Sequence, residues 1–490
     1  MSTISICLAV PDEFLGPAAY TFETLALRWG IPVTFTTRPE GAMIVYGART
    51  TDVGSQAMHI PCDPRLYLPD TECSHGRPFG FQVWGKANSV SELAGDLVAG
   101  AYRLLTYLDE SRVAESARDR CGTFPTAALS GSRRAIAGEP IVEQHAALLL
   151  HQMLLKHPGL DRAILPRWPN GKRWALAVTH DADHVHIGSC EEIVSSLLGS
   201  IRRLDGTKWK LFRLGFRYRN LPCRNPYFMF PRWHKWEGQR RITSAFYLYV
   251  RPNGVRRDAD DCKSTVADPR MDWIRLKEMA ASGWEFGLHP SIHAKESPES
   301  LLTAKAYLEK SLGTTVDGLR HHRLALDWRR PYATHSAHAR CGFRYDSSVA
   351  WRDEPGFRAA TCLPYRPFDP DEKKTVPIHV IPCSLKDRHV MRWSSAVQDD
   401  QYQAAVEAGQ SIINRVRSAG GVAVLDWHQE SAFNELEHVR HLDVLRDLLK
   451  PILKDSSVWI ATPGEICRHW EELTDRIAPA QHLEVGSRVG

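Results

Sequence analysis

The feature that most constrains this chain is an apolar run that ends in a cluster of charged residues. Residues 174–179 read Trp-Ala-Leu-Ala-Val-Thr, and residues 180–186 continue as His-Asp-Ala-Asp-His-Val-His. A short, continuous apolar run is typical of a strand buried on both faces, as in parallel sheets. Active sites of α/β barrels form at the carboxyl ends of such strands. Because a buried acidic pair is costly unless a cation compensates it, Asp181 and Asp183 predict a metal site. The alternative is a solvated turn capped by aspartate.

Two further apolar runs also end in polar residues. Residues 284–288 lead into His289 and His293, and residues 421–425 lead into Asp426-Trp427-His428. On one helical turn, His289 and His293 would face the same side, as two imidazoles that share a metal do. Together with the pair of aspartates, His289 and His293 would supply the ligands of an Asp-His-His metal site, with a surface histidine pair as the alternative. His428 fits a third metal ligand, a general acid or a packed core histidine.

The length of the chain predicts more than one domain. Its 490 residues exceed what one hydrophobic core usually serves, and its 43% hydrophobic and 24% charged residues are typical of globular proteins. Short apolar runs alternate with helical patterns in the first hundred residues, which predicts a small N-terminal α/β domain over residues 1–150. Within it, residues 109–140 are polar and rich in glycine, as connecting segments are. Residues 170–475 are expected to form the second domain.

The sequence predicts a cytoplasmic protein. The first ten residues lack the basic region of a signal peptide, and no stretch has the length of an apolar membrane span. The 11 cysteines form no C-x-x-C pair, which argues against a disulfide framework or a zinc ribbon. Contact with a membrane is therefore expected to be peripheral at most.

The positive charge of the chain is concentrated in one segment. The formal net charge is only +5, yet residues 201–241 contain twelve Lys or Arg against Asp205 and Glu237, interleaved with aromatic residues. This basic aromatic segment fits an anionic, lipid-linked or nucleotide-linked glycan at the barrel mouth, an anionic membrane surface, or a solvated face with buried aromatics. Nucleic acid is not expected, because no recognised binding fold accompanies the segment. Residues 256–261 are acidic but lack the spacing of an EF-hand, so a solvated loop is expected there.

The order of these motifs resembles that of the polysaccharide deacetylases with NodB homology, carbohydrate esterase family 4. The first motif is similar to Thr-His-Asp-Ala-Asp at 179–183 and the second to His-Pro-Ser-Ile-His at 289–293. The later motifs are similar to Gly-Leu-Arg-His-His-Arg at 318–323, to residues 342–349, 362–369 and 381–385, and to His428. The chain is most similar to a bacterial subgroup with an N-terminal α/β domain and a T-H-D-x-D-H motif. The resemblance implies a distorted (β/α)7-8 barrel behind that smaller domain.

The resemblance also implies a mechanism, which is metal-dependent removal of an N-acyl group from an amino sugar or glycan precursor. A divalent metal, zinc above all, would be held by Asp183, His289 and His293. Asp181 would act as general base and His428 as general acid. Arg320 would orient Asp181 or form a structural ion pair with it. The residues expected to bind substrate are Arg323, His322 and Trp427.

The chain departs from the family pattern at two motifs. The usual adjacent aspartates are separated as Asp181-Ala182-Asp183, which leaves open an exchange of roles between base and metal ligand, or binding of the metal by both carboxylates. Histidines follow Arg320. Two other functions therefore stay open. One is an amidohydrolase that acts on a carbon–nitrogen bond of a non-sugar compound. The other is a metal-containing, non-catalytic glycan-binding protein.

Overall fold

The computed structural model describes most of the chain. The described residues are 3–36, 38–48, 56–68, 95–186, 193–194, 197–199, 201, 206–218, 227–251, 258, 260–262, 265–267, 271–391, 398–431 and 440–477. Among the helices of these residues, none combines the length and the apolar character that crossing a membrane requires.

The N-terminal part contains a parallel sheet of four strands in the order β2-β1-β3-β4. The strands are β1 (Ile4–Ala9), β2 (Val33–Thr36), β3 (Ile44–Gly47) and β4 (Met58–Ile60). The helices packed with them are α1 (Asp12–Trp29), α2 (Leu97–Leu105) and α5 (Ile141–Lys156). Helix α1 ends at Gly30, whose φ of 71° is left-handed and where a Cβ would lie 2.5 Å from the Leu165 carbonyl oxygen. Only glycine fits this close contact.

The larger part is a distorted parallel barrel, as the sequence predicts. Its sheet has nine strands in the order β12-β9-β8-β7-β6-β5-β14-β13, with β15 paired to β5. The strands are β5 (Trp174–Ala182), β6 (Ala245–Leu248), β7 (Glu285–Leu288), β8 (Gly318–Leu319), β9 (Tyr345–Asp346), β12 (His379–Val380), β13 (Leu385–Lys386), β14 (Val422–Asp426) and β15 (Val458–Ile460). Residues 379–386 pair with β9 at one end and with β14 at the other, and so close the barrel.

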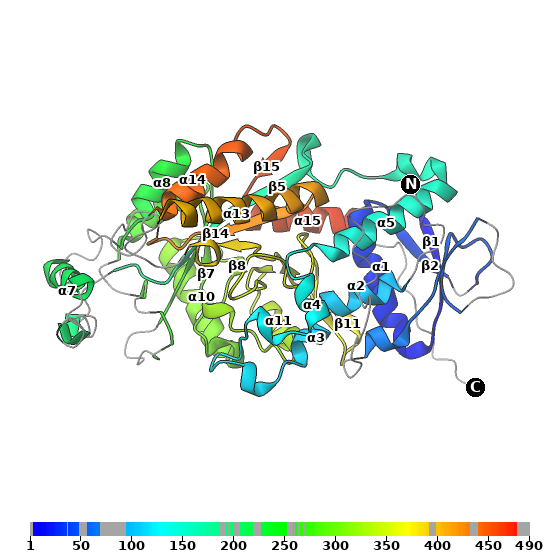
Figure 1. Ribbon diagram of the computed structural model, residues 1–490, viewed down its shortest axis with the longest axis horizontal. Helices are drawn as coiled ribbons and strands as arrows, with labels where there is room; N and C mark the ends of the chain where they lie inside the picture. Colours follow the sequence, from blue (N-terminus) through cyan, green and yellow to red (C-terminus); the bar gives the residue numbers. More distant parts are fainter. Residues whose placement is uncertain are drawn as a thin grey trace.

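Helices surround this barrel (Figure 1). They are α8 (Phe230–Gly238), α9 (Trp273–Ala281), α10 (Pro298–Leu312), α11 (Pro331–Arg340), α13 (Asp399–Ala419), α14 (His441–Ile452) and α15 (Pro463–Ile477). Helix α7 (Gly206–Tyr218) instead lies apart from the rest of the ribbon, at the end of the molecule opposite the N-terminal sheet (Figure 1). All nine residues of β5 are buried, which explains the apolar run over residues 174–178 at its start.

The two parts share one continuous hydrophobic core, which includes Ile6 and Leu25 as well as Trp351 and Trp470. Residues 109–140, expected as a connecting segment, contain the short helices α3 (Leu108–Ser111) and α4 (Gly131–Ala135). The guanidinium of Arg133 lies 2.9 Å from a carboxylate oxygen of Glu110, and both side chains are fully buried. This segment therefore packs into the core.

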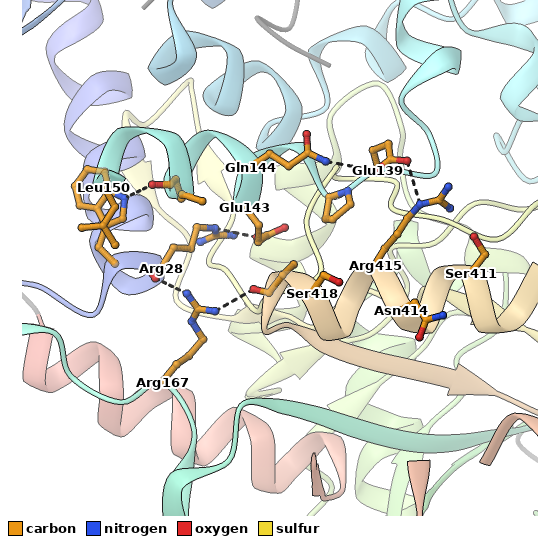
Figure 2. Close-up of a pocket in the computed structure, with 15 residues that line it drawn as sticks. Arg28, Glu139, Glu143, Gln144, Leu150, Arg167, Ser411, Asn414, Arg415 and Ser418 are labelled. Carbon is orange, nitrogen blue, oxygen red and sulfur yellow. Dashed lines mark hydrogen bonds and ion pairs between the residues drawn. The ribbon is translucent and has the colours of Figure 1, made fainter. Parts of the chain in front are cut away.

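A polar cavity of about 600 Å³ lies where α1 and α5 meet the carboxyl end of α13 (Figure 2). Arg28 Nε donates to Glu143 Oε1 at 3.1 Å, and Arg28 Nη2 donates to Thr361 Oγ1 at 2.8 Å. Arg167 donates to the carbonyl oxygens of Arg28 and Ala419, and so links α1 to the end of α13. These contacts fix the N-terminal part against the face of the barrel where its strands begin.

Candidate metal and catalytic site

The alternation of side chains along β5 separates its polar residues into two sets. Thr179 and Asp181 face the barrel interior, where both accept hydrogen bonds from Arg320. His180 faces α8 instead, and its Nε2 lies 2.9 Å from Glu237 Oε1. The other ring nitrogen of His180 donates to the Trp427 carbonyl oxygen at 2.6 Å. His180 is therefore a buried structural histidine that ties β5 to α8.

One arginine lies between two buried carboxylates inside the barrel. Arg320 Nη1 is 3.0 Å from Asp181 Oδ1 and 3.1 Å from Asp426 Oδ1. Burial by itself would raise the pKa of Asp181, but the charges of Arg320 and His289 lower it below its usual value. Burial and the nearby Asp181 charge raise the pKa of Asp426. Asp181 is consequently the carboxylate that stays ionised.

Four potential metal ligands meet at the carboxyl ends of β5, β6, β7 and β8. They are Asp183, Cys262, His289 and His322, whose ligand atoms all lie within 4.8 Å of one another. Asp183 Oδ1 is 3.0 Å from His289 Nε2 and 3.7 Å from Cys262 Sγ. Asp183 Oδ2 is 3.7 Å from His322 Nε2. The aspartate side chain is 14% exposed, so the group is shielded but open on one side.

In each of these histidines, the ring nitrogen that points away from Asp183 faces an oxygen atom. His289 Nδ1–H donates to the Arg320 carbonyl oxygen at 2.6 Å, which leaves Nε2 to face Asp183. His322 Nδ1 faces Asp261 Oδ1 at 3.3 Å. Asp261 in turn accepts from the hydroxyls of Tyr249 (2.8 Å) and Ser291 (2.5 Å). Such outer partners fix the tautomer and direction of metal-binding imidazoles.

His428 approaches Asp183 from the opposite side. Its Nε2 lies 3.7 Å from Asp183 Oδ2, while its Nδ1–H donates to Asp387 Oδ1 at 2.8 Å. Burial and the charge of Arg388 would lower the pKa of His428, but Asp387 and Asp426 raise it to about 9. Burial would raise the pKa of Asp387, but the charge and hydrogen bond of His428, together with the charges of His441 and Arg388, lower it well below its usual value. An imidazolium at neutral pH, fixed by a carboxylate, is suited to donate a proton.

The charges around Asp183 keep it anionic. Burial would raise its pKa, but His322, His289 and His428 lower it well below the usual value. Arg388 Nη2 also lies 3.2 Å from Asp183 Oδ2 and is 39% exposed, at the open side of the group. Burial, followed by the charge of Asp183, raises the pKa of the Cys262 thiol well above its usual value. A bound cation would reverse this effect, since a coordinating thiol is deprotonated.

The structure places three of the predicted site residues differently from the sequence analysis. His293 is 65% exposed and faces Asp258 Oδ2 at 3.2 Å, so it lies outside the ligand group. Residues 289–293 form no helix, and the spacing argument for His289 and His293 therefore does not apply. His322, expected to bind substrate, lies among the ligands instead. Trp427, also expected to bind substrate, is fully buried in the barrel core and donates to the His441 carbonyl oxygen.

Arg323 lies at the edge of the site. It is 40% exposed, and its Nη2 is 3.4 Å from Asp260 Oδ1. Arg323 and Leu324 both have φ values in the left-handed region, 54° and 56°. Two consecutive non-glycine residues of this kind are uncommon and concentrate at functional sites. The turn that follows His322 is therefore strained, and substrate binding by Arg323 stays a prediction.

The sequence analysis missed Cys262, Asp261 and Asp387. Asp261 ends the acidic segment expected to be a solvated loop, and Cys262 directly follows it. Both side chains are instead buried, Cys262 within the ligand group and Asp261 beside His322. Asp387 follows the closing strand β13. At Asp387 a polar residue comes directly after a strand, as at Asp183, and that position is the signal that could have indicated it. Asp261 and Cys262 lie far beyond the end of β6 in the sequence, so no such signal marks them.

Of the comparisons with known proteins, only the one with solved structures finds similar proteins. No protein-family profile matches the sequence, and no curated protein is similar to it. A protein from Mycobacterium smegmatis described as a polysaccharide deacetylase is 18% identical, with a TM-score of 0.41, over 64% of this chain and 95% of that one. A similarly described protein from Pseudomonas aeruginosa PAO1 is 17% identical, with a TM-score of 0.39, over 64% and 97%. The PuuE allantoinase is 16% identical, with a TM-score of 0.40, over 63% and 93%.

At such identities and TM-scores, these likenesses carry no argument about this chain. The chemistry of the chain has to follow from the residues of its own site.

Proposed function

We propose that this protein is a metal-dependent hydrolase that removes an N-acyl group, most often acetyl, from an amino sugar or glycan precursor. The observation that carries the proposal is that three groups lie together at the carboxyl ends of the barrel strands. These are the ligand set with Cys262, His289 and His322, the buried Asp181–Arg320 pair, and the His428–Asp387 pair. Together they supply a metal site, a base and an acid within one strand-end cluster.

The ligand set suits zinc. Imidazole, carboxylate and thiolate groups are all ligands that zinc accepts, whereas magnesium and calcium prefer oxygen ligands alone. The carboxylate and the thiolate would balance the charge of a divalent ion, which a buried site requires. A bound zinc ion polarises a carbonyl group and lowers the pKa of a coordinated water molecule.

Asp181 and His428 would carry out the two proton transfers that hydrolysis requires. Asp181 is ionised and held by Arg320, so it can accept a proton from the attacking water molecule. His428 is protonated at neutral pH and can donate a proton to the departing nitrogen, which leaves poorly without one. Arg320 is a positioning residue, since it contacts Asp181 and Asp426 from inside the barrel and is fully buried.

Release of acetate from N-acetylated amino sugars tests this proposal. Wild-type protein supplied with zinc should release acetate, and Asp181→Asn and His428→Asn should each lower the rate by about 100-fold or more. His293→Ala is the matched control, because it removes an imidazole that lies outside the cluster. Hydrolysis of ureides or other non-sugar amides, without acetate release from sugars, would favour the second candidate class. Zinc binding without hydrolysis of either substrate class would favour a non-catalytic glycan-binding protein.

A further inference from the structure

The basic aromatic segment divides into a packed half and an exposed half. In α8, Phe230, Trp233 and Glu237 are buried, and Glu237 is paired with His180. This half therefore has the buried aromatics expected of a structural element. The other half contains α7. We call this half, together with the described residues just before the segment, the arm: residues 193–194, 197–199, 201 and 206–218.

The arm exposes apolar side chains to an unusual extent. The described part of the chain has eleven exposed large hydrophobic side chains, and five of them lie in the arm. These five are Val194 (54%), Leu198 (46%), Ile201 (65%), Trp209 (47%) and Phe216 (55%). The first three are spaced i, i+4 and i+7, so they share one helical face. Exposed apolar side chains that gather in this way mark an interaction site.

Helix α7 has two distinct faces. On one, Leu211 packs with Tyr227, and Leu214 and Tyr218 join this small cluster. Trp209 lies on the other face, seven residues before Phe216, and its ring stacks on that of Phe212 at a centroid distance of 5.3 Å. This second face, which we call the aromatic face, is directed away from the small cluster.

Cations lie beside the aromatic face. Lys210, Arg213 and Arg217 are exposed, and at 100° per residue they fall next to Trp209 on the helix surface. The thirteen residues of α7 contain four Lys or Arg and no acidic residue. An exposed helix with aromatic side chains bordered by cations has the composition of a helix that lies in the interface of an anionic membrane.

The base of the arm is fixed beside the candidate site. Gln429, which follows His428, donates through Nε2 to the carbonyl oxygens of His184 and Tyr227. Its Oε1 accepts from the Met229 amide at 3.1 Å. The chain therefore leaves and re-enters the barrel at the strand end that carries His428. Figure 1 shows α7 lying outward from this end of the molecule.

We propose that the arm docks on the surface of an anionic lipid bilayer through the aromatic face of α7 and the apolar face that contains Val194, Leu198 and Ile201. Docking at this place would hold the strand-end site next to the membrane, where lipid-linked glycans lie. The contact needs no membrane-spanning helix, and it does not depend on the proposed hydrolysis. The rival occupants of the same surface are a second copy of the chain and a polyanion such as nucleic acid.

Flotation of the full-length protein with lipid vesicles tests the proposal. Vesicles of equal parts phosphatidylglycerol and phosphatidylcholine should bind it, and vesicles of phosphatidylcholine alone should bind it much less. Each interfacial cation is worth about fivefold in affinity, so Arg213→Gln with Arg217→Gln should weaken binding by roughly 30-fold. Trp209→Ser with Phe216→Ser should weaken it by about tenfold or more. The matched control, Ile274→Ser with Leu302→Ser, changes side chains that are 74% and 50% exposed on other helices and should leave binding unaltered.

Insertion of the arm can be followed directly. Bromine-labelled acyl chains should quench part of the tryptophan emission, and that part should disappear in Trp209→Phe although the variant still binds. Absence of binding, or equal binding to both vesicle types, would overturn the proposal. Dimers that dissociate in Trp209→Ser with Phe216→Ser would instead identify a second copy as the occupant. Tight heparin binding without quenching would identify a polyanion. Acetate release from a soluble N-acetylated sugar should not change in any arm variant, so this test is separate from that of the catalytic proposal.

Discussion

Replacement of His322 should weaken metal binding, whereas replacement of His293 should not. The sequence analysis assigns His293 to the metal and His322 to substrate binding, but the structure places His322 in the ligand group and His293 outside it. His322 is 10% exposed, with Nε2 3.7 Å from Asp183 Oδ2, and His293 is 65% exposed and faces Asp258. His322→Ala and His293→Ala therefore test the geometry of the ligand group.

The two substitutions are expected to change the Kd for zinc by very different factors. Loss even of an outer partner of a metal ligand typically weakens binding by 10–100-fold, so loss of the His322 ligand should raise the Kd by about 100-fold or more. This factor corresponds to about 2.7 kcal/mol. His293 contributes only an exposed ion pair with Asp258, and such a pair is worth about 0–1 kcal/mol. His293→Ala should therefore change the Kd by less than about fivefold.

Competition with a chromogenic chelator measures both Kd values on the purified variants, and circular dichroism checks that each variant is folded. His322→Gln serves as a second variant, because it keeps the size of the side chain but removes the imidazole. The reasoning is refuted if His293→Ala weakens zinc binding as much as His322→Ala, or if neither His322 variant weakens it.

Three further predictions concern other buried groups. Asp387→Asn should lower kcat by about 100-fold and move the pH optimum downward, because the Asp387 carboxylate holds the pKa of His428 at about 9; an unchanged pH–rate profile would contradict this. Burial raises the pKa of Asp96 to about 6, so its contribution to folding is present below its usual pKa and is lost as the pH rises through about 6. Denaturant unfolding should show that the free energy of unfolding of the wild type, relative to that of Asp96→Asn, falls by about 3 kcal/mol between about pH 4 and pH 7. A difference that does not depend on pH would contradict this prediction. Glu143→Gln leaves the Arg28 guanidinium buried without its carboxylate and should cost about 3–5 kcal/mol of unfolding free energy in urea; a loss below about 1 kcal/mol would show the pair to be unimportant.

The barrel could be predicted from the sequence because its strands are buried on both faces. The apolar runs at residues 174–179, 284–288 and 421–425 fall on β5, β7 and β14. A strand that is buried on both faces has a continuous run of apolar residues, and such a run can be recognised in a single sequence. The polar residues that follow them meet at one edge, because parallel strands end on the same side of the sheet.

The remaining ligands could not be predicted, because they depend on how loops fold back onto that edge. Nothing in the local pattern distinguishes Cys262, in a loop after β6, from a solvated residue. His322 and His293 differ only in the path of the backbone. A left-handed turn follows the first, and residues 289–293 form no helix that would bring the second beside His289. Spacing rules for metal ligands require a known secondary structure, and here the expected helical turn is absent from the described residues 289–293.

The exposed arm shows a different limit. The composition of residues 201–241 indicates an anionic partner, but composition cannot separate buried from exposed aromatic residues. The structure assigns Trp233 to the core and leaves Trp209 at the surface. Four of the twelve cations of the segment lie on the exposed helix α7, which contains no acidic residue, and a lipid surface therefore becomes a testable partner.

Elemental analysis of the purified protein tests the central claim most directly. The proposed metal site predicts one zinc ion per chain in the wild type and the loss of that ion in Asp183→Ala, with the zinc content of His293→Ala unchanged. A folded wild-type protein that binds no divalent metal after incubation with zinc, or an Asp183→Ala variant that retains the full wild-type content, would contradict it.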